Sequence, residues 1–220
     1  MPFVRLELAV LSVHGGALKV LLGKRTQAPH AGKWALPGGV LRVDLDHDLA
    51  ATAQRVAMER LGVALPGCTQ LCTVGHKDRD PRAPWAMSVV YRSLLQIESI
   101  DATPGKRLEA LRWVQADEAM RDTTLAFDHA VLVRRAVEVT QLEVRALQFQ
   151  AGLLPQQFTL AELQAAAEVV LATKLDKSSF RRRLDDAGAV VAVPGAMRTG
   201  AFRPAQLYEI VGQRSTRPQS

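Results

Sequence analysis

The chain is poor in cysteine and contains no long hydrophobic run. Its two cysteines, Cys68 and Cys72, form a C-x3-C pair without other Cys or His at zinc-binding spacing, so we expect plain thiols. No segment approaches the roughly 18 uncharged apolar residues of a membrane span. Residues 1–7 carry charges where a signal peptide needs an apolar block. We therefore expect a cytoplasmic protein without a membrane partner.

The composition is that of an ordinary globular protein. The 220 residues, 48% hydrophobic and 23% charged, are enough for one sizeable core and a small second domain. The net charge is +6, and residues 151–220 carry 9 Lys or Arg against 6 Asp or Glu. This balance favours a polyanionic partner, although many solvated surfaces have the same character.

The most informative stretch is Gly32 to Val63. It contains the sequence W-A-L-P-G-G, starting at Trp34, and feeds an amphipathic helix expected from Asp48 to Leu61 with Gly62 as its C-cap. This stretch resembles the Nudix motif, G-x5-E-x7-R-E-U-x-E-E-x-G-U, in which U is aliphatic. With Gly39 as the opening glycine, Arg55 stands at the motif arginine, and the loop before it is about two residues longer than the pattern.

The catalytic carboxylates of that motif are mostly absent. In the active motif three glutamates share one helix face and gather oxygen ligands for Mg²⁺ beside substrate phosphates. The corresponding positions here are Val56, Glu59 and Arg60. One glutamate beside a cation is a poor magnesium ligand, because the arginine supplies competing positive charge. We interpret the region as a Nudix frame that keeps a pocket but has no catalytic residues, no metal and no resident cofactor.

Two arginines are candidates for contacting a ligand in this pocket. Arg25 follows a strand expected at residues 18–23, where the glycine-rich loop opens. Arg82 lies in the segment Asp78 to Arg82, which resembles the D-x-D-P-R-G element of Nudix proteins that bind ADP-ribose. Both could equally be solvated surface cations. The resemblance gives this set of candidate ligand-binding residues: Arg25, Trp34, Gly38, Gly39, Arg55, Glu59 and Arg82.

A helix expected from Asp128 to about Arg145 leads out of the first domain. It is preceded by Phe127, and Phe127-Asp128-His129 matches an F-D-H element of the regulatory Nudix proteins. A lone histidine such as His129 is more often capping or structural than catalytic. Residues 151–155, which include a glycine and a proline, are the expected linker.

The segment after the linker reads as a winged helix-turn-helix. Thr159 and Glu162 have the spacing of a capping box for a helix starting at Leu160, and Asp176 can cap a second helix. Two short helices joined by a tight turn form the core of a helix-turn-helix. A strand at residues 189–193, a turn at Pro194-Gly195 and a returning strand at residues 202–210 complete the expected wing.

The second of these helices has the layout of a recognition helix. At 100° per residue, Phe180 and Leu184 mark the buried side and Arg182 lies almost opposite them. Arginines and serines on such a face can reach base edges and phosphates. Three consecutive arginines could also merely solvate a helix. The candidate DNA-binding residues are Lys177, Ser178, Ser179, Arg181, Arg182, Arg183, Arg198 and Arg203.

The segment from Phe158 to Tyr208 resembles the C-terminal domain of the NrtR family of Nudix-related regulators, most clearly in the phrases L-D-K-x-x-F-R-R and R-P-A-Q-L-Y. The resemblance implies an α/β fold: a Nudix α/β/α sandwich at residues 1–150 and a C-terminal winged helix-turn-helix domain at residues 151–220. It also implies a homodimeric repressor of NAD-metabolism genes. Such a repressor leaves its double-stranded operator DNA when an effector, ADP-ribose or a related nucleotide, occupies the Nudix pocket.

Two other functions remain open from the sequence. One is a Nudix hydrolase of a nucleoside diphosphate derivative, with atypical metal ligands drawn from Glu59, Asp44, Asp46 or Asp48. The other is a nucleotide-sensing adaptor whose winged helix binds a protein.

Overall fold

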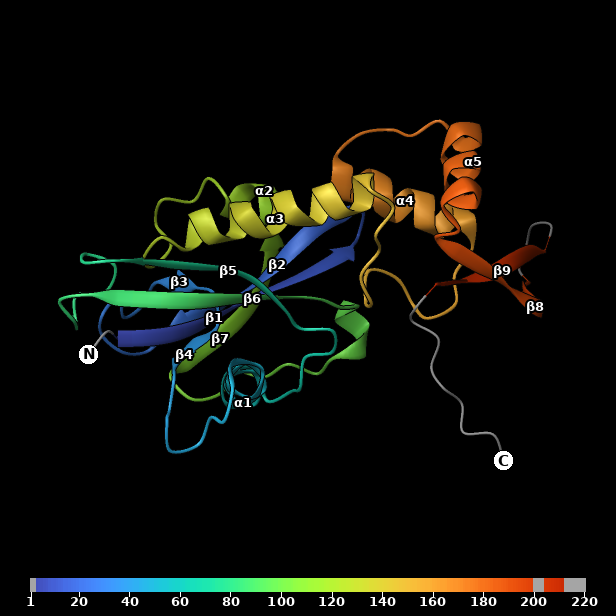
Figure 1. Cartoon of the computed structure of the whole chain (residues 1–220). Coiled ribbons are helices and arrows are strands. Elements are labelled where there is room, and N and C mark those ends of the chain that lie inside the picture. Colours follow the sequence, from blue (N-terminus) through green and yellow to red (C-terminus); the bar gives the residue numbers. More distant parts are fainter. Residues whose placement is uncertain (1–2, 200–203, 212–220) are drawn as a thin grey trace, which may run out of the picture.

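The structure is a computed structural model that describes residues 3–199 and 204–211. Its N-terminal part is a mixed sheet with helices on both faces (Figure 1). The elements of this part are β1 (Phe3–His14), β2 (Ala17–Arg25), β3 (Trp34–Ala35), β4 (Gly38–Val40), α1 (Leu49–Leu61), β5 (Thr69–His76), β6 (Ala86–Leu94), the 3-10 turn Ile97–Ser99, β7 (Leu108–Gln115), α2 (Ala116–Ala119) and α3 (His129–Arg145).

Strand β1 lies at the centre of the sheet. The strand order is β3-β2-β1-β6-β5, with β4 paired to β1 and β7 to β2. β1 and β6 are parallel, whereas β1 is antiparallel to β2. Along β1, Leu8 and Val10 face α1, and Ala9 and Leu11 face α3. Both faces are covered, and this explains why β1 reads as a nearly continuous apolar run rather than an alternating one.

Helix α1 begins and ends where the sequence predicts. The Asp48 carboxylate accepts a hydrogen bond from the Ala51 N–H at 2.7 Å, and Gly62 closes the helix at φ +70°. A residue without Cβ adopts this left-handed conformation at little cost. The strand predicted at residues 18–23 is present within β2, and the helix predicted from Asp128 to about Arg145 is α3. Strand β4 and helix α2 were not predicted because they have only three and four residues.

The C-terminal part contains α4 (Leu160–Leu171), α5 (Lys177–Ala187), β8 (Val190–Arg198) and β9 (Ala205–Ile210). Both expected helix caps form: Thr159 and Glu162 make the capping box, and Asp176 accepts from the Ser179 N–H at 2.8 Å. Two helices followed by an antiparallel hairpin complete the helix-turn-helix and its wing (Figure 1).

The turn expected at Pro194-Gly195 was wrong. Strand β8 continues through both residues to Arg198, and the pairing with β9 shifts register between Ala192 and Met197. The Gln206 side chain donates to the carbonyls of Val193 and Ala196 across this irregularity, at 2.7 and 3.0 Å. Pro and Gly here mark a bulge and not a chain reversal, because a side-chain amide replaces the missing ladder bonds. The returning strand begins at Ala205, and its expected start at Phe202 lies outside the described residues.

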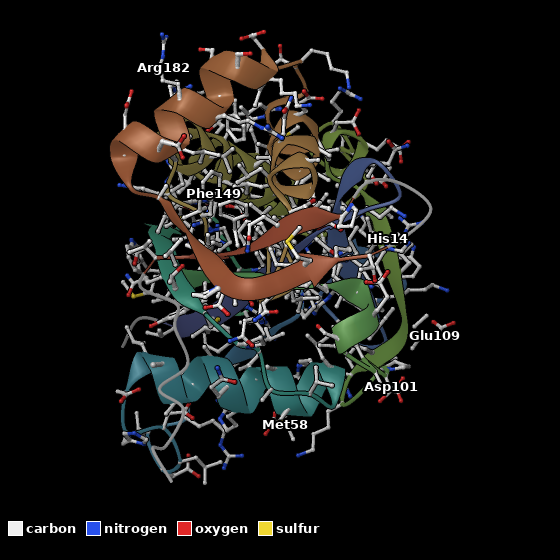
Figure 2. All side chains as sticks on the ribbon, turned by 90° about the vertical axis from the view of Figure 1, so that its right-hand side faces the viewer. His14, Met58, Asp101, Glu109, Phe149 and Arg182 are labelled. Atoms are coloured by element: carbon white, nitrogen blue, oxygen red, sulfur yellow. The ribbon has the colours of Figure 1, made fainter. Side chains whose placement is uncertain are left out.

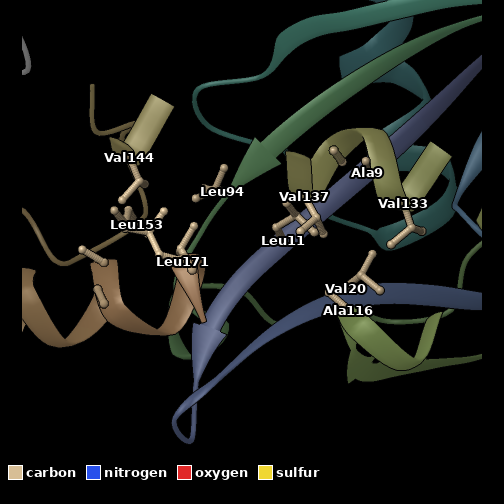
Figure 3. Packing of buried hydrophobic residues seen from close by; sticks show 14 of the residues in the cluster. Ala9, Leu11, Val20, Leu94, Ala116, Val133, Val137, Val144, Leu153 and Leu171 are labelled. Carbon is tan, nitrogen blue, oxygen red and sulfur yellow. The ribbon is translucent and has the colours of Figure 1, made fainter. Parts of the chain in front are cut away.

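One hydrophobic core runs from the sheet into the C-terminal part. Leu11 and Leu94 of the sheet share it with Val144 of α3, Leu171 of α4 and Leu153 of the connection (Figure 3). It continues into α5 through Phe180 and Leu184. The two parts therefore pack as one body, with α4 against α3 and the ends of β1 and β2.

The expected linker, residues 151–155, is held against the sheet. Leu153 is 1% exposed, and the Gln96 side chain donates to the carbonyls of Gly152 and Leu153 at 3.0 Å each. A Cβ on Gly152 would lie 2.1 Å from the carbonyl oxygen of Leu94, so only glycine fits there. No helix among residues 3–199 and 204–211 is long and apolar enough to span a bilayer.

Candidate functional site

A narrow cleft opens where β2, β4 and the loop after β5 meet. Five arginines line it together with the glycine pair of β4. The lining residues are Arg5, Arg25, Gln27, Ala28, Leu36, Gly38, Gly39, Val40, Arg60, Arg82, Arg107 and Leu108. Its cavity volume is about 30 Å³. A cavity needs about 10–15 Å³ for each water molecule that it holds, so this one has room for about two or three. A nucleotide can therefore enter only if side chains or loops move.

Acidic partners neutralise only some of the cleft's arginines. Arg5 is paired with Glu7 at 2.8 Å, and Arg82 with Asp80 at 2.5 Å. Among the described residues, Arg25 donates only to backbone carbonyls, those of Pro29 at 3.0 Å and Gln27 at 3.3 Å. Burial, and then the charge of Arg5, lowers the pKa of Arg25 to about 10. An anion entering the cleft would relieve this repulsion, so the cleft favours a multivalent anionic ligand.

The helix carrying the Nudix-like motif packs beneath the cleft floor through Val56 and Arg60. Val56 is buried, and a Cβ on Gly39 would lie 2.7 Å from its Cγ2 atom. Arg55 does not line the cleft. It binds the Asp46 carboxylate through Nε at 2.6 Å and Nη2 at 2.7 Å, and this contact lowers the pKa of Asp46 to about 2. Asp46 therefore orients the motif arginine, a role that the sequence did not assign to any one acid of this loop.

The donor set for a divalent cation does not fit. Glu59 is the one motif glutamate, and it lies among three cations: Arg55 at 3.4 Å, Lys106 at 3.8 Å and Arg60 at 4.0 Å. Within the described ranges no three His, Cys, Asp or Glu side chains cluster as metal ligands would. A metal ion needs several free oxygens, and this carboxylate is already surrounded by positive charge.

The F-D-H element forms the wall behind the cleft. The Phe127 ring lies 5.2 Å from the Arg25 guanidinium and 5.4 Å from that of Arg5. His129 is buried, and its Nδ1 accepts from the Leu36 N–H at 2.9 Å. Burial lowers the pKa of His129 to about 4, so the ring is neutral and structural, as the sequence indicated. Asp128 pairs with the buried Arg79, which fixes the start of α3 against the sheet.

The structure brings four of the predicted ligand residues together: Arg25, Gly38, Gly39 and Arg82 all line the cleft. Trp34 does not, because its side chain faces the α3 side of the sheet under Arg112, 4.0 Å away. Arg55 and Glu59 are also absent from the residues that line the cleft.

Sequence reasoning missed Arg5, Arg60 and Arg107 as lining residues. The sequence alone could have identified Arg60, since a cation stands at a position where the motif has a carboxylate. No sequence pattern indicated Arg5 or Arg107, because their place in the cleft depends on strand pairing and on the loop before β7.

A second hollow is larger but lacks this convergence of charge. It has a volume of about 780 Å³ and lies between the β1–β2 turn, α2, α3 and α4. Its main charged side chains, Glu168 and Lys174, pair with each other at 2.8 Å. We therefore place the candidate ligand site in the narrow cleft, on chemistry rather than size.

Helix α5 presents the candidate nucleic-acid surface. Phe180 and Leu184 are buried beneath it, as predicted, and Arg181 and Arg182 are exposed. Figure 2 shows Arg182 projecting outward from α5 at the edge of the molecule. Among the described residues neither arginine has an acidic partner, so both are available for phosphates or bases.

The other predicted DNA residues differ in availability. Lys177 and Ser178 are exposed, and Ser179 is half-buried. Arg183 donates to the carbonyl of Arg145 at 2.8 Å. Arg198 is ion-paired with Glu162 at 3.1 Å. Arg203 lies outside the described residues.

Comparisons with known proteins match both parts of the chain. A NUDIX domain model matches residues 5–136, and a model of the NrtR DNA-binding winged helix domain matches residues 150–210. An ADPR responsive transcriptional repressor of Acinetobacter baylyi is 34% identical over 96% of this chain and 83% of its own length. The crystal structure of Shewanella oneidensis NrtR complexed with a 27mer DNA is similar over 94% of this chain and 93% of that one, with 32% identity and a TM-score of 0.75.

A third structure covers the N-terminal part alone. The NUDIX domain of Shewanella oneidensis NrtR complexed with ADP ribose is 31% identical over 63% of this chain and 88% of that one, with a TM-score of 0.58. The predicted fold class is confirmed, whereas the exact boundary at residue 150 stays a prediction. Because family models and full-length relatives match both parts in the same order, this chain belongs to the NrtR family of Nudix-related transcriptional regulators.

Proposed function

We propose that this protein is a repressor that binds operator DNA through α5 and releases it when ADP-ribose or a related nucleotide occupies the arginine-lined cleft. The observation that carries the proposal is the combination, on one chain, of an exposed arginine helix and a cleft with excess positive charge. DNA and a nucleoside diphosphate are both polyanions. The relatives support it, since one is named as ADPR responsive and others were crystallised with DNA and with ADP ribose.

Helix α3 offers a physical link between the two sites. At its start, His129 holds the Leu36 backbone of the cleft, and Asp128 is paired with Arg79. At its end, the carbonyl of Arg145 accepts the hydrogen bond from Arg183 of α5. A ligand that displaces the cleft wall would shift one end of α3, and the other end is bonded to the helix that reads DNA.

We also propose that the protein is not a hydrolase and has no resident cofactor. The three aspartates that could have replaced the motif glutamates as metal ligands already bind other groups of the protein. Asp44 is paired with Arg42 at 2.5 Å, Asp46 binds Arg55, and Asp48 caps α1. The measurement is Mg²⁺-dependent release of AMP from ADP-ribose. Rapid turnover by preparations free of contaminating hydrolase would favour the enzyme instead.

Three further features of the proposal come from family membership. We propose a cytoplasmic homodimer that regulates genes of NAD metabolism. A two-fold dimer would present two α5 helices to a palindromic operator, with half-sites about one helical turn or a multiple apart. Sedimentation of the free protein and the symmetry of a selected binding site would test the dimer. An adaptor that binds protein instead would select no DNA sequence.

The central experiment measures linkage between the two ligands. The purified full chain would first select a duplex from a random library. Titration calorimetry would then give the affinity for ADP-ribose with and without that duplex. Linkage requires that DNA weakens ADP-ribose binding by the same factor by which ADP-ribose weakens DNA binding. Equal ligand affinity in both titrations would refute the proposal.

Two cleft variants sharpen this experiment. Arg25→Ala and Arg82→Ala should bind the duplex normally but no longer leave it when ADP-ribose is added, because both side chains line the cleft and bond to neighbouring residues there, not to α5. Variants that lose DNA affinity in the absence of ligand would instead indicate a damaged fold.

A further inference from the structure

Arg60 stands where the Nudix motif has a metal-binding glutamate, and its guanidinium points into the cleft. The residue is 7% exposed and lines the cavity. Its Nε donates to the carbonyl of Gly38 at 2.8 Å, and its Nη1 donates to the carbonyl of Lys106 at 2.8 Å. Backbone carbonyl oxygens of this kind can be metal ligands, but here the guanidinium already bonds both of them.

The second terminal nitrogen of Arg60 is directed toward the glycine pair. Nη2 lies 3.7 Å from the position that a Cβ on Gly39 would take, and it makes no hydrogen bond to any described residue. The two backbone bonds hold the guanidinium plane, so this free N–H edge is fixed at the cleft floor. Arginine is well suited to such a position because its planar fork matches phosphate oxygens.

The charges around Arg60 add to its own and do not cancel it. Five arginines line the cleft, and among the described residues Arg5 and Arg82 each have a close carboxylate partner, Glu7 and Asp80. Glu59 lies 4.0 Å from Arg60 but is shared with Arg55 and Lys106. The cleft floor therefore has an excess of fixed positive charge in the part of the fold where a hydrolase would hold its cation.

We propose that Arg60 is a tethered substitute for the divalent cation, so that this cleft binds the diphosphate of its ligand without metal. The guanidinium supplies the positive charge that Mg²⁺ would supply, but it has no coordination position in which a bound water becomes a hydroxide nucleophile. Val56 and Arg60 together remove two of the motif's metal-binding carboxylates, and Arg60 in addition retains diphosphate binding, which is what a sensor requires. The inference rests on the proposed function, because it concerns how the ADP-ribose site holds its ligand.

The test compares ADP-ribose binding in EDTA and in excess Mg²⁺ by calorimetry. The unmodified protein should bind equally well in both buffers. Arg60→Glu should lose at least about tenfold in affinity in EDTA, because a charge-assisted contact is replaced by repulsion, and should recover part of it in Mg²⁺. Arg135→Glu is the matched control: it makes the same charge reversal on the exposed face of α3 and should behave like the unmodified protein.

A purely structural role for Arg60 is tested separately. Arg60→Gln removes the charge and keeps a polar amide that can donate a hydrogen bond, although its shorter side chain does not reproduce both backbone bonds. If the variant melts like the unmodified protein, and inorganic pyrophosphate competes with ADP-ribose only on the unmodified protein, the charge itself binds the diphosphate. Equal competition by pyrophosphate on both proteins would overturn the inference.

The possible results separate the two claims. Binding of ADP-ribose by the unmodified protein only in Mg²⁺ would overturn the role of Arg60 and leave the proposed function standing. No binding in either buffer would overturn both. Binding that is equal in both buffers, lost in Arg60→Glu and restored there by Mg²⁺ is the result that the inference expects.

Discussion

Arg183 of α5 donates a hydrogen bond to the carbonyl oxygen of Arg145, the last residue of α3, over 2.8 Å. The two residues are 38 positions apart and belong to different parts of the fold. The contact joins the DNA-facing helix to the end of the helix that begins at the ligand cleft. It also satisfies one of the carbonyls left without a partner at a helix C-terminus.

We first predict that Arg183 governs coupling more than affinity. Arg183→Ala should reduce the factor by which ADP-ribose weakens DNA binding, because the link from α5 to α3 is lost. Arg181→Ala is the control, since Arg181 is exposed and has no such bond. It should weaken DNA binding without changing the coupling factor. Shift assays with and without ADP-ribose measure both quantities, and an unchanged factor in Arg183→Ala would contradict the link.

The exposed arginines of α5 should differ in how they read DNA. Arg182→Ala should cost about 1–3 kcal/mol and relax specificity at one base pair per half-site. Arg181→Ala should weaken all sequences alike and lower the slope of log affinity against log salt by about one. Competition between selected and mutated duplexes over a range of salt concentrations separates the two. An unchanged sequence preference in Arg182→Ala would mean that α5 docks on DNA in another orientation.

Stability should fall in mild acid because of His129. Burial lowers the pKa of this side chain to about 4, below its value of 6.5 in an unfolded chain. At pH 7 the ring is neutral in both states. As the pH falls from about 6.5 to about 4, the unfolded state takes up a proton that the folded state does not. The free energy of unfolding should therefore drop by about 2 kcal/mol between pH 7 and pH 5 from this group alone.

Urea unfolding at the two pH values measures this effect. His129→Asn should be less stable at pH 7, although an amide oxygen can still accept from the Leu36 N–H, and should lose less on going to pH 5. His47→Asn is the control, because His47 is 81% exposed. The same pH dependence in His129→Asn and the unmodified protein would assign the effect to other groups.

Gly39 and Val56 should show strong thermodynamic coupling. A Cβ at Gly39 would lie 2.7 Å from Val56 Cγ2, so Gly39→Ala should destabilise by about 1–3 kcal/mol through overpacking. Val56→Ala removes the methyl group that clashes, so the double variant should be more stable than the sum of the single effects predicts. A double-mutant cycle in urea provides the comparison, and additive effects would show that the clash is relieved elsewhere.

Local sequence signals predicted the longer helices with their caps, and the motifs indicated the family. The caps Asp48, Thr159 and Asp176 act through side chains that bond backbone N–H groups three residues away, so their effect is readable from spacing alone. The burial of Phe180 and Leu184 followed from helical period in the same way. The loss of the motif carboxylates could be recognised from the sequence because the motif defines the intervals between its arginine, its glutamates and its closing glycine.

The tertiary structure decided which charges meet. Arg5, Arg60 and Arg107 converge only because β1 pairs with β4, α1 packs beneath them, and the loop before β7 folds back on α1. Asp46, rather than Asp44 or Asp48, binds Arg55 because the loop doubles back on itself. Pro194-Gly195 became a bulge because the Gln206 side chain satisfies the flanking carbonyls of Val193 and Ala196. Local hydrogen bonds and helical periodicity can be predicted from the sequence. The convergence of side chains from separate elements in one cleft depends on long-range pairing, which only the tertiary structure shows.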